Sequence, residues 1–131
     1  MDEHLELLKK YKFEKQLGKL NKKLKNKSIL IYGAGIFFKK IKDNYDLSNL
    51  NIVGISDKKY TLEQEGQEDL GYKIVPYDKI LEFNPDYILI ATLNTFNIYQ
   101  SFNKKIKKEG LKIKLLPLVD KPFFELLKEV F

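Results

Sequence analysis

The sequence predicts a doubly wound α/β domain whose parallel sheet has about five strands in the order 3-2-1-4-5, behind an N-terminal helical extension. Two observations predict this class. Short apolar runs alternate with helix-compatible segments along the chain, which is the pattern of repeated βαβ units. The first apolar run ends abruptly in Gly33-Ala34-Gly35, and a helix-compatible segment follows at once. Right-handed crossovers then favour the stated strand order.

The extension spans residues 1–26 and precedes an α/β domain at residues 27–131. It is highly charged, and its leucines recur at helical spacing. The spaced residues are Leu5, Leu8, Leu17, Leu20 and Leu24. An apolar stripe of this kind must be covered, either by the sheet domain or by a second copy of the chain.

The remaining elements follow in order. Strands are predicted at 28–32, 51–57, 71–76, 87–92 and 111–116, the third and fifth ending at Pro76 and Pro117. Helices are predicted at 36–44 and 77–83, from residue 95 to about Glu109, and at 123–131. Residues 61–71 are acidic and polar without a clear period, so we expect a loop with at most a short helical turn. The run at 87–92 is almost wholly apolar, as in a central strand buried on both faces.

Composition bounds the function. A chain of 131 residues with 44% hydrophobic residues fits one globular domain. The N-terminus is polar and acidic, and no apolar run approaches the roughly 18 residues needed to cross a bilayer. There is no cysteine. We therefore expect a cytoplasmic protein without a membrane span, a disulfide or a thiolate metal site.

The net charge of +6 does not indicate nucleic-acid binding. All 24 basic residues are lysines, and arginine is the preferred side chain for bidentate phosphate and base-edge contacts. Lysine clusters such as residues 22–25 and 104–108 fit solvated helix faces better.

The glycine loop is the main candidate for a binding site. Gly33 allows a tight turn off the strand, and Gly35 carries no Cβ that would keep a pyrophosphate from the backbone. The helix that begins at Ile36 offers free N–H groups and a positive dipole end to an anion. The third glycine of the dinucleotide fingerprint is absent, because Phe38 takes its place, so this helix stands further from the sheet or its ring fills a gap. A tight turn without a ligand is the alternative.

Further candidates lie on the same rim, because ligands of such sheets bind at the carboxyl ends of the strands beside the switch point. Asp57 ends the second strand, where a carboxylate accepts hydrogen bonds from ribose hydroxyls; the other reading is an Asp that starts a turn with Lys58 and Lys59. Thr92 and Asn94 follow the fourth strand. The full predicted binding set is Gly33, Ala34, Gly35, Ile36, Asp57, Thr92 and Asn94.

The segments 31–35, 53–57, 71–76 and 86–92 occur in an order that resembles a known kind of domain. It is the small Rossmann-like domain at the N-termini of bacterial polysaccharide-biosynthesis proteins, which include sugar epimerase/dehydratases, sugar N-acetyltransferases and FkbM-type methyltransferases. The resemblance covers roughly residues 27–118. It implies binding of a nucleotide, a nucleotide-sugar or NAD(P) at Gly33, Ala34, Gly35, Asp57 and Thr92. Phe38 and the absence of a fused catalytic domain depart from that pattern.

No catalytic constellation is visible. The one histidine, His4, lies in the polar N-terminal segment, and the Tyr11 to Lys15 spacing precedes the glycine loop. No metal site is expected. Two hypotheses remain, a nucleotide-binding domain of a sugar-modifying enzyme and a ligand-free module that dimerises or docks an enzyme through its N-terminal helix. A third is a small enzyme completed by a partner subunit.

Overall fold

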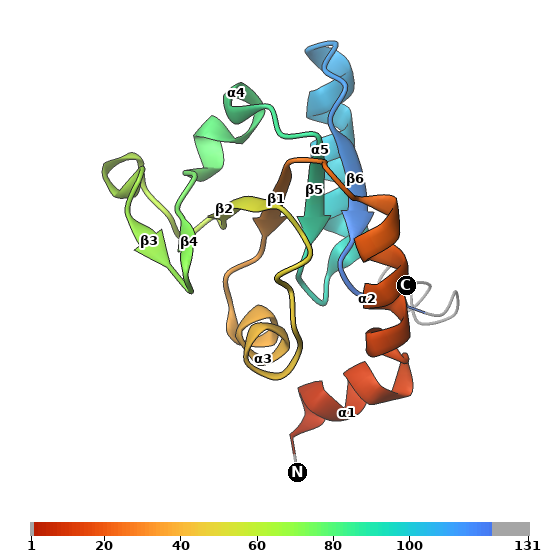
Figure 1. The fold of residues 1–131 in the computed structure, drawn as a ribbon. Coiled ribbons are helices and arrows are strands. Elements are labelled where there is room, and N and C mark those ends of the chain that lie inside the picture. The colour runs from red at the N-terminus through yellow and green to blue at the C-terminus, as the bar shows by residue number, and fades with distance from the viewer. Residues whose placement is uncertain (1, 122–131) are drawn as a thin grey trace.

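The computed structural model describes residues 2–121, which form a parallel sheet with helices on both faces (Figure 1). The sheet order is β2-β1-β5-β6, and all three pairings are parallel. Its strands are β1 (Ile29–Tyr32), β2 (Ile52–Ser56), β5 (Tyr87–Ile90) and β6 (Lys114–Pro117). The doubly wound class and the placing of the first strand between the second and fourth predicted strands are confirmed.

The helices match the predicted ones closely. They are α1 (Glu3–Lys10), α2 (Phe13–Lys23), α3 (Ile36–Asn44), α4 (Ile80–Phe83) and α5 (Thr95–Lys108), with 3-10 turns η1 (Leu62–Gln64) and η2 (Tyr77–Lys79). The segment expected to form one helix at 77–83 is therefore a 3-10 turn followed by a single α-helical turn. The predicted helix at 123–131 lies outside the described residues.

The side chains of the two central strands alternate between two cores, as the period of a strand requires. Ile29 and Ile31 of β1 join Leu89 of β5 in the core under the N-terminal helices and α3. Leu30 of β1 and Ile88 of β5 join the other core, under α5. Because both faces are covered, β1 and β5 are buried along their whole length.

The prediction of a five-stranded sheet was wrong in its third strand. Residues 72–73 form β4 (Tyr72–Lys73), which pairs antiparallel with β3 (Glu68–Asp69) in a separate two-stranded ribbon. The segment touches the main sheet through one parallel bridge between Ile55 and Ile74. The backbone of residues 72–73 is already hydrogen-bonded to β3. Further along, Pro76 has no N–H to donate, so a hydrogen-bond ladder along β2 cannot continue through it.

The N-terminal leucine stripe covers the sheet domain of its own chain. Leu8, Leu17 and Leu24 are buried in the same core as Ile31, and so is Phe13. The sequence left open whether the sheet domain or a second copy of the chain covers the stripe. The structure shows that the sheet domain covers it. The other two leucines of the stripe, Leu5 and Leu20, are partly buried and pack against the same core.

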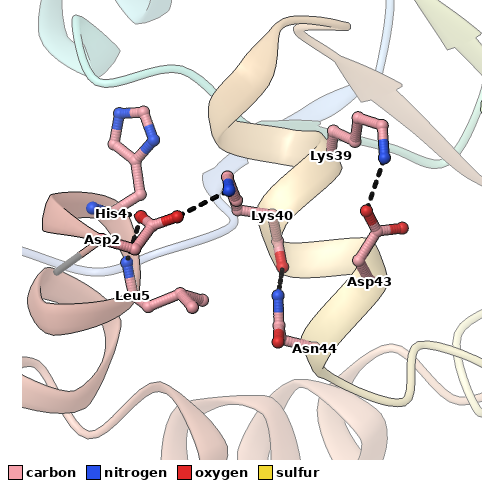
Figure 2. A network of polar contacts seen from close by, with 7 residues as sticks. All are labelled: Asp2, His4, Leu5, Lys39, Lys40, Asp43 and Asn44. Atoms are coloured by element: carbon pink, nitrogen blue, oxygen red, sulfur yellow. Dashed lines mark hydrogen bonds and ion pairs between the residues drawn. The ribbon is translucent and has the colours of Figure 1, made fainter.

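Helix α1 is also fixed to α3 by polar contacts (Figure 2). The Asp2 carboxylate caps α1 by accepting from the N–H groups of His4 and Leu5, at 3.0 and 3.2 Å. Its second oxygen lies 2.6 Å from the Lys40 ammonium on α3. The His4 ring meets the Phe37 ring edge-on, with 5.4 Å between centroids. The N-terminal helix thus rests on the helix that follows the glycine loop.

Candidate functional site

The loop between β1 and α3 turns at Gly33, and the surrounding backbone requires glycine there. Gly33 has φ of +117°, and a Cβ at this position would lie 2.8 Å from Thr92 Cγ2 and 3.0 Å from the Ala91 carbonyl oxygen. The Gly33 N–H donates to the Ser56 carbonyl at 2.8 Å. The first glycine of the motif therefore serves close packing of three strand ends.

Asp57 and Lys59, which follow β2, hold the next residue of the loop from both sides. Asp57 Oδ2 accepts the Ala34 N–H at 2.8 Å, and Oδ1 accepts the Lys59 N–H at 3.1 Å. The Lys59 ammonium donates to the Ala34 carbonyl at 2.8 Å. Asp57 thus starts a turn with Lys59, as one of its two readings expected, and it also braces the backbone of the glycine loop; its binding of a ribose stays a prediction.

Gly35 differs from Gly33, because the protein around it does not require glycine. Its φ is −95°, and a Cβ built there has nothing within 4 Å. Gly35 is the N-cap residue of α3 and supplies no capping side chain. The first-turn N–H groups of a helix lack intrahelical partners, and here they sit at an exposed, uncapped end. Such an end favours an anion by hydrogen bonding and by the helix dipole.

Ile36 lies at the first position of α3 and is 68% exposed, so it contributes an apolar side chain beside the uncapped end. Phe38 is fully buried, and its ring lies 6.2 Å from that of Tyr72. The sequence predicted either a helix further from the sheet or a ring that fills a gap. The structure shows the second, because the Phe38 ring fills space between α3 and the β3–β4 ribbon.

The carboxyl end of β5 supplies the other side of the rim. Thr92 contacts the Gly33 turn, and its Oγ1 is a buried atom without a hydrogen-bond partner among residues 2–121. The Ser56 hydroxyl, at the end of β2, is in the same condition. Asn94 lies further along, at the N-cap of α5, where its side-chain oxygen accepts from Asn97 at 2.9 Å. The structure thus joins Gly33, Ala34, Asp57 and Thr92 directly, whereas Asn94 interacts within its own helix.

Two tyrosines near the rim have pKa values shifted in opposite directions. Burial, reinforced by the Asp57 charge, raises the pKa of Tyr32. The Lys105 ammonium donates to the Tyr77 hydroxyl at 3.0 Å, and this hydrogen bond lowers the pKa of Tyr77. A groove of about 560 Å³ between α4 and α5 is lined by Tyr77 and Lys105.

Lys59 is the site residue that the sequence analysis missed. It was treated only as a turn residue after Asp57. The available signal was its position two residues after Asp57, next to a strand end that lies beside the glycine loop. Within residues 2–121, no three His, Cys, Asp or Glu side chains gather as a metal site would require. Over the same span, no helix combines the length and apolar character that a membrane crossing needs.

Residues 25–116 match the model of the family described as C2185-like, N-terminal. A comparison with curated proteins found no match. Among solved structures, the chain is similar to the crystal structure of RSP in complex with β-NADH, at a TM-score of 0.48 and 21% identity. That match covers 83% of this chain and 56% of RSP.

Proposed function

The chain belongs to the C2185-like, N-terminal family, and we propose that its domain binds a nucleotide-type ligand by a phosphate placed at the N-terminus of α3. The matched segment contains the whole candidate site. The ligand classes that fit are NAD(P) and nucleotide-sugars, both of which carry a pyrophosphate. A role in polysaccharide biosynthesis belongs to the same proposal and rests on the sequence resemblance alone.

The observation that carries the proposal is the contrast between the two glycines. Gly33 is explained by packing, because a Cβ there would collide with Thr92 and the Ala91 carbonyl. Gly35 faces open space at an uncapped helix end, so the absence of its side chain leaves room for a group from outside the chain. Glycine is tolerated at an N-cap, but Ser, Thr, Asp or Asn would satisfy the helix N–H groups better.

Asp57 and Lys59 support the proposal because they fix the loop. An anion-binding loop gains affinity when its N–H groups are already oriented and need no ordering on binding. Here the backbone of Ala34 is held at both its N–H, which donates to Asp57, and its carbonyl, which accepts from Lys59. The competing hypothesis of a ligand-free docking module loses one of its supports, since most of the leucine stripe is buried within the chain.

The test uses the variant Gly35→Asp, which puts a capping carboxylate where the ligand phosphate would lie. Relative to glycine, a capping side chain stabilises a helix by only a few tenths of a kcal/mol, so the variant should unfold at or slightly above the wild-type temperature when no ligand is present. It should also lose binding, because its carboxylate occupies the N–H groups and repels phosphate.

The assay is a thermal-shift panel with NAD⁺, NADP⁺, UDP-glucose, GDP-mannose and buffer. Ligand at about 100 times its Kd adds roughly 2.7 kcal/mol of stability to the folded state. The wild type should shift with at least one nucleotide and Gly35→Asp with none. A wild type that shifts with no ligand at millimolar concentration, or a Gly35→Asp variant that shifts as the wild type does, would contradict the proposal.

A further inference from the structure

The Asp57 carboxylate, at the end of β2, already accepts hydrogen bonds from the protein backbone. In dinucleotide-binding domains that take NAD, an acidic residue at this place accepts hydrogen bonds from the ribose 2′-hydroxyl. In this chain, each oxygen of Asp57 accepts a backbone N–H, one from Ala34 and one from Lys59. Asp57 thus stabilises the loop, and its capacity to accept from a ribose is reduced.

The neighbouring positive charge is, by contrast, still available. An ammonium group has three N–H donors, and Lys59 uses one of them on the Ala34 carbonyl. Within the described residues, no carboxylate forms an ion pair with Lys59, whose side chain is exposed. Lys58 adds a second exposed ammonium, which lies 5.8 Å from the Tyr77 ring centre. Two ammonium groups against the single Asp57 carboxylate leave the β2 end of the site with a net positive charge, which suits an anion better than a neutral diol.

We infer that the site prefers a dinucleotide with a 2′-phosphate on its adenosine ribose, the NADP class, over NAD, and that Lys59 is the specificity-determining residue. This inference rests on the proposed function and narrows it. The ribose lies near the end of the second strand in dinucleotide-binding sheets, where a basic side chain accommodates the 2′-phosphate. Nucleotide-sugars such as UDP-glucose present only free ribose hydroxyls there and would leave the lysine charges unpaired. Lys59 can donate to a phosphate without giving up its bond to Ala34, because two of its N–H donors remain.

The test is isothermal titration of NADP⁺, NAD⁺ and UDP-glucose into the full chain and two variants. Lys59→Met keeps most of the side-chain length and removes the charge. Lys104→Met is the matched control, since it removes one charge from an exposed position on α5. The wild type should bind NADP⁺ about tenfold or more tightly than NAD⁺, the difference that one charge-assisted hydrogen bond supplies. Lys59→Met should weaken NADP⁺ more than NAD⁺ and so lose that preference, with any smaller loss shared by both dinucleotides reporting its bond to Ala34, and Lys104→Met should retain the preference.

Four results decide between the inference and the proposed function. Equal affinity for NAD⁺ and NADP⁺ overturns the inference and leaves the proposed function standing, as does binding of UDP-glucose alone. An equal loss of both dinucleotides in Lys59→Met also overturns the inference, because Lys59 would then act only through the Ala34 loop. Failure of all three ligands to bind the wild type overturns both.

Discussion

Replacing Gly33 by alanine should destabilise the protein more than any other substitution in the glycine loop. The added Cβ would lie 2.8 Å from Thr92 Cγ2 and 3.0 Å from the Ala91 carbonyl oxygen, at a φ of +117°. Neither neighbour can retreat easily. Thr92 is β-branched and stiff, and Ala91 is held to β1 by its N–H bond to the Tyr32 carbonyl at 2.7 Å.

The magnitude follows from two contributions. A non-glycine residue in such a backbone conformation costs about 1–3 kcal/mol, and overpacking a tight contact costs about another 1–3 kcal/mol. Their sum, roughly 2–6 kcal/mol, is a large part of the 5–15 kcal/mol that stabilises a typical domain. For a chain of this length it corresponds to a fall in Tm of order 10 °C.

The assay is urea denaturation followed by far-UV circular dichroism, because the chain contains no tryptophan. Gly35→Ala is the matched control: its Cβ meets nothing within 4 Å and its φ is −95°. It should change the free energy of unfolding by less than about 1 kcal/mol. If the two variants unfold at the same urea concentration, the assignment of Gly33 to packing and Gly35 to an open site is refuted.

Two further predictions concern the N-terminal helices. Phe13→Ala should lower the free energy of unfolding by about 3–5 kcal/mol, because Phe13 is fully buried and stacks edge-on against Tyr45 at 4.9 Å; a loss in urea denaturation no larger than that of a surface substitution would show that α2 is peripheral. Asp2→Asn keeps a helix cap but removes the charge that pairs with Lys40. That pair lowers the pKa of Asp2, so its stabilising contribution is present above the ordinary value of 3.8 and is lost as the pH falls through the lower folded value. The variant should thus be less stable than the wild type at neutral pH and equally stable in strong acid, and a gap independent of pH in urea denaturation would refute the pairing.

The main sheet could be predicted from the sequence because its strands are specified locally. The apolar runs at β1 and β5 are buried on both faces, and the glycine loop marks where β1 ends. The prediction of the third strand was wrong because the period of the apolar residues does not show which strand a segment pairs with. Tyr72 and Lys73 have a nearby antiparallel partner in β3, where Glu68 stands opposite Lys73. A local ribbon closes a short loop and so competes well with a distant parallel strand.

The site was predictable in position and less so in detail. Gly33, Asp57 and Thr92 were placed on one rim, and the structure brings each to the loop. The hydrogen bond from the Ala34 N–H to Asp57 depends on the backbone path of residues 33–35. The pattern of residue types does not predict that path. The role of Lys59 follows from the same path, since its ammonium reaches the Ala34 carbonyl only when the loop turns as it does.

The buried N-terminal helices have a consequence for how this family is divided into pieces. The family match begins at residue 25, yet Leu8, Phe13 and Leu17 before it complete one side of the core. A fragment cut at the family boundary would lose part of the cover on that side of the sheet, where Ile29 and Ile31 of β1 lie, and would keep the part that α3 supplies. Sheets of parallel strands need cover on both faces. The segment that matches the family is therefore smaller than the unit that builds this core, because α1 and α2 lie before it.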